Sequence, residues 1–286
     1  MKIKILTLFP DMFTGFIQES IIKRAIEKGV VEVSLIDIRE YSLDKHKHVD
    51  DTPCGGGAGM VMAVDVVDRC IKANKSDVSH IVMMTPQGVP YNQKKAEELS
   101  KLDELVILCG HYEGFDERIR SYVDEEISIG DFVLTGGEIP AMVISDSVIR
   151  LLDHAIRAES HEDDSFSTGL LEYPQYTRPV EYDGMKVPEV LLSGNHKNIE
   201  TFRKKESLRR TYLKRPDLLK NYKLNKEEER LLKEVIEEEK VWEKPECCYT
   251  FHHYQVIIPS ALSDTMLISL WIFWKVVVCI FGRLCQ

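Results

Sequence analysis

The chain has 286 residues, of which 44% are hydrophobic, and a formal net charge of −10. This composition excludes a wholly disordered chain, and the length predicts two domains with a sizeable core. The seven cysteines form no C-x-x-C pair, which argues against a disulfide scaffold or a zinc ribbon and predicts a cytoplasmic location. The apolar run at residues 3–9 is followed by Pro10 and lacks a cleavage site, so we interpret it as a strand rather than a signal peptide.

Strand-like and helix-like segments alternate in the first half of the chain. Apolar runs rich in β-branched residues predict strands at residues 3–9, 30–38, 81–84 and 105–109. Helical patterns predict helices at residues 13–25, 92–101 and 139–152, the first of which ends near Gly29. Strands that alternate with helices predict an α/β fold with a mainly parallel sheet.

The second half of the chain is organised differently. A polar, acidic stretch begins at Asp153 and predicts a mobile linker. Beyond it, one helix is predicted to end before Pro216, and Asn225 with Glu228 forms a capping-box pattern for another. The predicted organisation is an α/β domain at residues 1–160, a linker at 161–176, a small helical domain at 177–244 and an atypical tail at 245–286.

Net charge alone argues against a nucleic-acid partner, but the distribution of charge does not. Residues 196–223 contain ten Lys and Arg and only three Asp and Glu, so this stretch carries about seven positive charges. Because phosphate binding needs a local concentration of cations, this block predicts a nucleic-acid contact surface within the helical domain.

The tail at residues 245–286 differs in composition from the rest of the chain. It contains four of the seven cysteines and ends in an apolar run at residues 266–281 that is interrupted by Ser269 and Lys275. This run is shorter than the roughly 20 residues that a membrane-spanning helix needs. We therefore favour an appended segment unrelated to the fold, with a membrane anchor as the alternative.

Three predicted strand ends are followed by glycine-bearing loops. Residues 85–88 (T-P-Q-G), 110–118 (G-H-Y-E-G-F-D-E-R) and 128–138 (S-I-G-D-F-V-L-T-G-G-E) occupy these positions. Glycine lets the backbone approach a ligand closely, and ligands of open α/β sheets bind at the carboxyl ends of the strands. One such loop is usually a simple turn, but three together predict the walls of a single pocket.

The glycine-rich segment at residues 54–60 (C-G-G-G-A-G-M) does not have the form of a nucleotide-binding loop. It lacks the Gly-Lys-Ser/Thr ending of a P-loop and the strand and helix context of a dinucleotide fingerprint, so a turn or a flexible loop over the substrate fits better. Upstream, His46 and His48 with Asp50 and Asp51 make a candidate metal cluster, although a solvated loop is the more usual outcome for such a run.

At these residues the chain resembles a known family. The segments I-L-T-L-F-P-D-M-F, V-D-D-T-P-C-G-G-G-A-G-M-V-M, G-H-Y-E-G-F-D-E-R, S-I-G-D-F-V-L-T-G-G-E-I-P-A-M and E-D-D-S-F carry the resemblance. So do E-Y-P-Q-Y-T-R-P, P-E-V-L-L-S-G-N-H and R-K-K-E-S-L-R-R-T. They are similar to the bacterial tRNA (guanine-N1-)-methyltransferases, the TrmD family of the SPOUT class, over roughly residues 1–243.

The resemblance implies methylation of N1 of guanosine 37 in tRNA by an S-adenosyl-L-methionine (AdoMet)-dependent homodimer. It also implies a deep trefoil knot in the sheet, an active site at the subunit interface, and no membrane association unless the tail supplies one. By the same resemblance, residues 1–160 bind AdoMet and residues 177–244 bind tRNA. Mg²⁺ is a candidate cofactor to which we assign no ligands.

The resemblance also implies which residues act. Asp164 falls on the general base and Arg150 on the stabiliser of guanine O6, with Glu113 as a third catalytic residue. AdoMet binding falls on Thr85, Pro86, Gln87, Gly88, Gly110, Tyr112, Glu113, Ile129, Gly130, Asp131, Phe132, Val133, Leu134, Gly136 and Gly137. The basic block nominates Arg203, Lys204, Arg209, Arg210 and Lys214 as tRNA-binding residues. By residue type alone, Arg150 and Asp164 would be ordinary surface residues.

Two other functions are consistent with the sequence. One is a SPOUT methyltransferase that acts on another RNA position, such as a ribose 2′-hydroxyl. The acidic residues 162–166 favour deprotonation of a base nitrogen instead, because guanine N1 carries a proton that must leave. The other is a non-catalytic RNA-binding module that retains the pocket without its activity.

Overall fold

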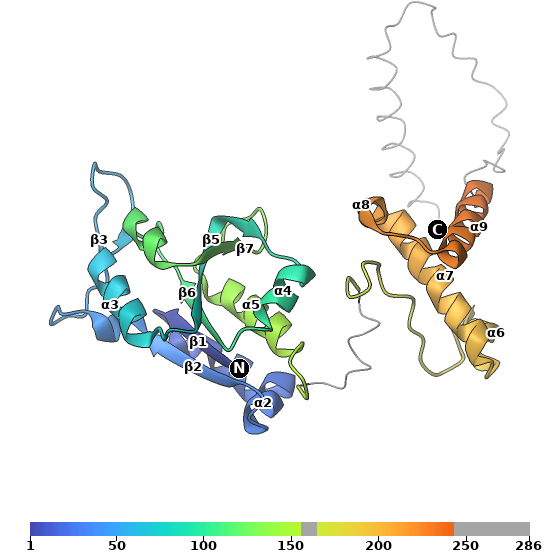
Figure 1. The fold of residues 1–286 in the computed structure, drawn as a ribbon, viewed down its shortest axis with the longest axis horizontal. Helices are drawn as coiled ribbons and strands as arrows, with labels where there is room; N and C mark the ends of the chain where they lie inside the picture. The colour runs from blue at the N-terminus through green and yellow to red at the C-terminus, as the bar shows by residue number, and fades with distance from the viewer. Residues whose placement is uncertain (156–164, 243–286) are drawn as a thin grey trace, which may run out of the picture. The chain divides into compact units, whose positions relative to one another are not determined.

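The computed structural model of the chain describes residues 1–155 and 165–242. The first part is built on a five-stranded sheet in the order β2-β1-β6-β5-β7, in which all neighbouring strands are parallel (Figure 1). The prediction of an α/β fold with a parallel sheet is therefore confirmed. The strands are β1 (Lys2–Thr7), β2 (Glu32–Asp37), β5 (Ser79–Pro90), β6 (Glu104–Cys109) and β7 (Glu125–Ser128).

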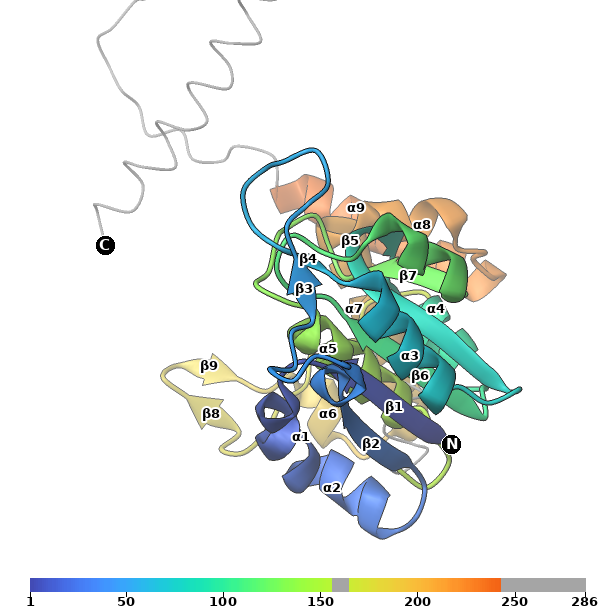
Figure 2. The same cartoon turned by 90° about the vertical axis from the view of Figure 1, so that its left-hand side faces the viewer.

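Helices cover both faces of this sheet. The α-helices are α1 (Thr14–Gln18), α2 (Ser20–Glu27), α3 (Val64–Asn74), α4 (Gln93–Leu99) and α5 (Glu138–Ile149). Three 3-10 turns are η1 (Pro10–Phe13), η2 (Ile38–Tyr41) and η3 (Glu117–Tyr122). A short antiparallel hairpin, β3 (Asp50–Asp51) with β4 (Val61–Met62), lies between β2 and α3 in sequence (Figure 2).

The central strand β6 shows why the sheet is covered twice. All six of its residues are buried. Leu105 and Ile107 pack in one core cluster with residues of α2, α4 and α5, whereas Val106 and Leu108 pack in a second cluster with residues of α3. A continuous apolar run is therefore what this strand requires, since neither of its faces meets water.

The structure differs from the expected elements at four places. The helix expected at residues 13–25 is broken between α1 and α2, where Ser20 has a φ of 56°. Strand β5 continues past Met84 to Pro90 through a register shift against β7. Helix α3 was not predicted, and β7 was expected only as a strand end before the loop at 128–138, with no range of its own.

Between residues 165 and 242 the structure describes four helices and a second small hairpin. The helices are α6 (Glu189–Leu192), α7 (His196–Lys214), α8 (Pro216–Asn221) and α9 (Lys226–Trp242), and the hairpin is β8 (Glu181–Tyr182) with β9 (Met185–Lys186). Leu170, Leu208 and Leu231 form the buried centre of this part. The α7 and α9 predictions are confirmed, since α7 ends before Pro216 and the side chain of Asn225 accepts from the backbone N–H of Glu228 (2.9 Å).

Among the described residues, no helix is long and apolar enough to cross a membrane. The tail at residues 245–286 lies outside the described residues, as do residues 156–164 of the linker region. The predicted domain boundaries stay predictions.

Candidate active site

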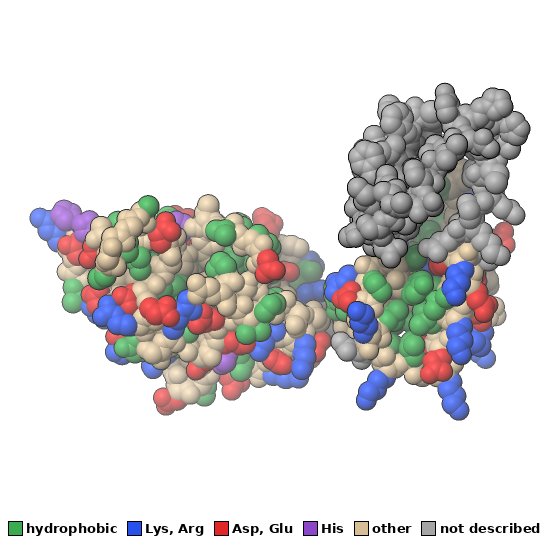
Figure 3. Space-filling view, turned by 90° about the horizontal axis from the view of Figure 1, so that it is seen from above, with side chains coloured by type: hydrophobic (Ala, Val, Ile, Leu, Met, Phe, Trp, Pro, Cys, Tyr) green, Lys and Arg blue, Asp and Glu red, His purple; other side chains and the backbone are tan. Residues whose placement is uncertain are grey.

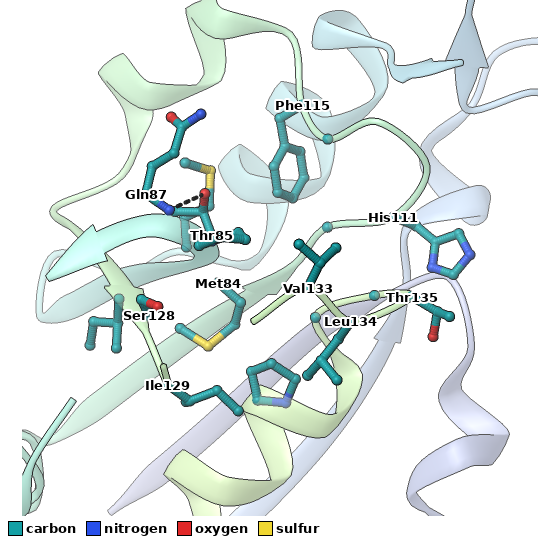
Figure 4. A pocket seen from close by; sticks show the side chains of 18 of the residues that line it. Met84, Thr85, Gln87, His111, Phe115, Ser128, Ile129, Val133, Leu134 and Thr135 are labelled. Atoms are coloured by element: carbon teal, nitrogen blue, oxygen red, sulfur yellow. Dashed lines mark hydrogen bonds between the residues drawn. The ribbon is translucent and has the colours of Figure 1, made fainter. Parts of the chain in front are cut away.

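The carboxyl ends of β5, β6 and β7 meet at a pocket of about 460 Å³ (Figure 4). The three loops predicted to form one pocket all contribute to its walls. Its size is within the range of small-molecule sites, and apolar side chains alternate with backbone and polar groups around it. The lining residues are Met83, Met84, Thr85, Pro86, Gln87, Gly110, His111, Tyr112, Glu113, Gly114, Phe115, Glu117, Arg120, Ile127, Ser128, Ile129, Gly130, Phe132, Val133, Leu134, Thr135, Gly136, Gly137 and Pro140.

Two glycines allow the loops to approach this closely. A Cβ on Gly88 would lie 2.4 Å from the backbone nitrogen of Ile127, and one on Gly137 would lie 2.7 Å from the Cα of Cys109. Both neighbours are backbone atoms that cannot rotate away, so these positions exclude any side chain. The missing Cβ atoms let the last part of β5 pack against β7, and let the turn before α5 pack against the end of β6.

Within the pocket wall, Arg120 joins the first two loops. Its guanidinium donates to the Gln87 side-chain oxygen (2.5 Å), to Glu117 (2.8 Å) and to Glu126. The backbone N–H of Gln87 also donates to the Thr85 hydroxyl (3.3 Å; Figure 4). These contacts fix residues 85–87 of β5 against the segment that follows β6.

The segment after β6 has its own charge pair. Asp116 accepts two hydrogen bonds from the Arg118 guanidinium (2.8 and 2.6 Å) and one from the Arg118 backbone N–H (3.0 Å). These bonds, led by the side-chain bond, lower the pKa of Asp116 to about 2. Asp116 therefore stays ionised at neutral pH and is engaged in holding the loop.

Two further side chains flank Gly110 in the sequence: His111 lines the pocket, whereas Cys109 is buried and does not. Burial, together with the charge of Glu138, raises the pKa of the Cys109 thiol well above its ordinary value, so this cysteine is protonated and no candidate nucleophile. The His111 ring lies against Phe9 at 4.8 Å between centroids, and its buried Nδ1 has no hydrogen-bond partner among the described residues. Its position directly after Gly110 was the only signal in the sequence.

The residues predicted to bind AdoMet lie at this pocket, apart from two. Gly88 and Asp131 are absent from the lining residues, although Gly88 sets the loop spacing. Arg150 caps the C-terminal end of α5 and does not line the pocket. Asp164 lies outside the described residues. The roles assigned to all these residues stay predictions.

In the candidate metal cluster near the first hairpin, one histidine contacts a carboxylate that lies outside the cluster. His48 Nδ1 lies 2.7 Å from a carboxylate oxygen of Asp44, which has two backbone hydrogen bonds as well. In the ranges 1–155 and 165–242, no group of three or more His, Cys, Asp or Glu side chains could hold a metal ion.

The predicted tRNA-binding residues all lie on α7. Arg203 stacks on the Tyr173 ring at 4.8 Å, Lys204 lies 3.5 Å from Glu228, and Arg209 pairs with Glu206 (3.0 Å). Arg210 and Lys214 have no carboxylate within ion-pair distance in the part of the chain that the structure describes. In Figure 3, Lys and Arg side chains project from these C-terminal helices on either side of a strip of hydrophobic side chains.

Comparison with known proteins identifies relatives over most of the chain. A model of the tRNA (Guanine-1)-methyltransferase TrmD family matches residues 1–221. A tRNA (guanine-N(1)-)-methyltransferase of Fusobacterium nucleatum is 59% identical over 240 residues, which cover 84% of this chain and 100% of that protein. Proteins of the same name from Geobacillus kaustophilus and Bacillus pumilus are 56% and 58% identical, over 85% and 80% of this chain and 99% and 96% of their own lengths. The chain therefore belongs to the tRNA (guanine-N1-)-methyltransferase (TrmD) family.

Proposed function

We propose that this protein transfers the methyl group of AdoMet to N1 of guanosine 37 in tRNA. The observation that carries the proposal is the pocket at the ends of β5, β6 and β7. Its walls are the loops that the family resemblance assigns to AdoMet, including Gln87, Tyr112 and Leu134. Membership of the family supports a methyl donor and a guanine N1 acceptor in tRNA.

The residues at the pocket fit AdoMet chemically. Met84, Ile127 and Leu134 offer apolar surface for an adenine ring, while the backbone of the glycine-rich turns offers hydrogen-bonding groups that need no side chain. Glu113 supplies a carboxylate at the pocket wall, which suits a sulfonium cation better than a lysine would. When bound, AdoMet supplies the electrophilic methyl group.

The remaining chemistry falls to this chain's own residues. Guanine N1 is a poor nucleophile while it carries its proton, so Asp164 accepts that proton as the new N–C bond forms. Negative charge that develops on O6 is stabilised by the Arg150 guanidinium. In this assignment the carboxylate and the guanidinium act on two atoms of one base edge.

The tRNA phosphates would be held by the cations of α7, and a second subunit would complete the site. Ile139 and Val143 support the homodimer, because they lie four positions apart on α5 and are 47% and 42% exposed. An apolar stripe of this kind on a helix of a soluble domain favours burial against a partner. The trefoil knot and the cytoplasmic location are part of the same proposal and rest on the family resemblance.

Transfer of a labelled methyl group from AdoMet to tRNA tests the function. We expect label in tRNA with guanosine at position 37 and none in tRNA with adenosine there. Mass analysis of the digested product should find 1-methylguanosine. A 2′-O-methylated nucleoside would favour the other SPOUT reaction, and tight binding without transfer would favour a non-catalytic module.

A further inference from the structure

The glycine-rich segment at residues 55–59 is not part of the pocket wall, yet it lies directly behind it. It connects β3 to β4 and forms the tip of that hairpin (Figure 2). Four of its glycines have positive φ angles. The function proposed above gives this segment no task.

Strand β4 and the residue before it pair with the pocket loop that follows β6. The Glu113 backbone N–H donates to the Met60 carbonyl (3.0 Å), and the Met62 N–H donates to the Gly114 carbonyl (2.9 Å). The Asp116 N–H donates to the Met62 carbonyl (3.2 Å), and Met62 forms a parallel bridge with Phe115. The hairpin therefore supports the backbone on both sides of Glu113.

Gly59 also contacts the Glu113 side chain. A Cβ on Gly59 would lie 2.4 Å from Glu113 Oε1, 2.5 Å from its Cγ and 2.8 Å from its Cδ. The other glycines of the loop differ, because a Cβ on Gly55 or Gly56 meets nothing within 4 Å and one on Gly57 meets only Pro53 at 3.6 Å. The Glu113 carboxylate thus occupies the space that a side chain at position 59 would fill.

We propose that Gly59 is a positioning residue that sets the direction of the Glu113 carboxylate at the methyl-donor pocket. The inference rests on the proposed function, in which Glu113 faces the sulfonium of AdoMet. Alanine at position 59 would displace the carboxylate rather than the backbone, because the clashing atoms belong to an exposed, flexible side chain. The carboxylate would then no longer have the direction that it has in the wild-type pocket.

The chain offers a matched control for this test. Gly56 and Gly59 both have a φ of 83°, so Gly56→Ala and Gly59→Ala each place an alanine at the same unfavourable φ. Only Gly59→Ala collides with Glu113. We expect Gly59→Ala to weaken AdoMet binding by about 10–100-fold, the effect of losing an interaction with a charged group. The loss for S-adenosylhomocysteine, which lacks the sulfonium charge, should be smaller, and Gly56→Ala should bind both ligands like the wild type.

A double-mutant cycle separates positioning of Glu113 from a general defect in the loop. If Gly59 acts through Glu113, the Gly59→Ala, Glu113→Gln double variant should bind AdoMet no more weakly than Glu113→Gln alone. Additive losses, an equal loss for both ligands, or equal behaviour of Gly59→Ala and Gly56→Ala would overturn the proposal, as would a neutral Glu113→Gln. Failure of the wild-type protein to bind AdoMet would instead contradict the proposed function itself.

Discussion

The hydroxyl of Thr7 donates a hydrogen bond of 2.8 Å to the carboxylate of Glu138, 131 positions later in the chain. Both residues are buried, with exposed fractions of 0% and 2%. Thr7 ends β1 and Glu138 begins α5, immediately after the Gly136–Gly137 turn at the pocket. This bond therefore ties the end of β1 to the turn that contributes Gly136 and Gly137 to the pocket lining.

Replacing Thr7 by valine keeps the shape of the side chain but removes the donor. The Glu138 Oε1 atom would lose its partner in a buried site, and we expect the free energy of unfolding to fall by about 1–3 kcal/mol. Urea unfolding measured by circular dichroism would show the change as a lower midpoint with an unchanged slope. Thr52→Val is the control, since Thr52 is exposed and bonds only to its neighbour Asp51. Equal stability of the Thr7 and Thr52 variants would mean that the bond contributes nothing.

A second buried carboxylate predicts how stability depends on pH. Burial alone would raise the pKa of Glu104, but hydrogen bonds from Ser79, Lys4 and Ser76 outweigh it and lower the pKa to about 2. A carboxyl group with a lowered pKa in the folded state stabilises the fold above its ordinary pKa of 4.5. That contribution is lost as the pH falls from about 5 towards about 2.

We therefore expect Glu104→Gln to destabilise the protein by about 1–3 kcal/mol at pH 7, since Lys4 and both serines lose a charged acceptor. The difference from the wild type should shrink steadily between pH 5 and pH 2 in denaturant titrations. Glu32→Gln serves as a control because Glu32 is exposed and lies 4.0 Å from Lys2. A gap between wild type and Glu104→Gln that stays constant over this pH range would refute the assignment.

Much of the fold follows from local patterns, and the exceptions have physical reasons. The continuous apolar run at residues 105–109 predicts a buried strand, and in the structure all residues of that strand are buried. The break at Ser20 has no local signal, since serine seldom adopts a positive φ and tertiary packing must impose it. Helix α3 did carry a signal in the sequence, since Val66, Val67, Cys70 and Ile71 recur at helical spacing and are buried on one side.

The sequence predicts which loops form the site but not how their side chains are arranged in space. Glycines after three strands predict that backbone surrounds a ligand, and the pocket lies there. The support from Gly59 behind Glu113 joins residues 54 positions apart and depends on the hairpin pairing with the pocket loop. The open Nδ1 of His111 likewise depends on how Phe9 packs against the ring, which no spacing of residues reveals.

Asp163, next to the proposed general base Asp164, provides a matched control for substitution of the base. Asp164→Ala should leave AdoMet binding near normal while methyl transfer falls by about 10²–10⁴-fold, the usual contribution of a general base. Asp163→Ala removes the same charge one position away and should retain activity close to the wild type. Single-turnover transfer and calorimetric AdoMet binding measure the two effects separately. Full activity of Asp164→Ala, or equal losses in both variants, would remove Asp164 from the role of base.

Among the five nominated α7 cations, Arg210 and Lys214 have neither a described carboxylate partner nor a ring contact, and they should contribute most to phosphate binding. A cation already paired with a carboxylate has less charge to offer RNA, so Arg210 and Lys214 are better candidates than Arg209, which pairs with Glu206. Each phosphate contact adds to the salt dependence of binding through counterion release. We expect the Arg210→Ala, Lys214→Ala double variant to bind tRNA more weakly. The plot of the logarithm of the association constant against the logarithm of salt concentration should become less steep by about 1–2.

The control for this experiment is Arg230→Ala on α9, which removes a cation that already pairs with Glu234 at 2.6 Å. Its slope should match that of the wild type, because its charge is neutralised within the protein. Filter binding of tRNA at several salt concentrations gives all three slopes, and AdoMet affinity should not change in either variant. A double variant with the wild-type slope would show that the phosphates lie away from this end of α7. An equal fall in the Arg230 variant would indicate a response to net charge rather than to direct contacts.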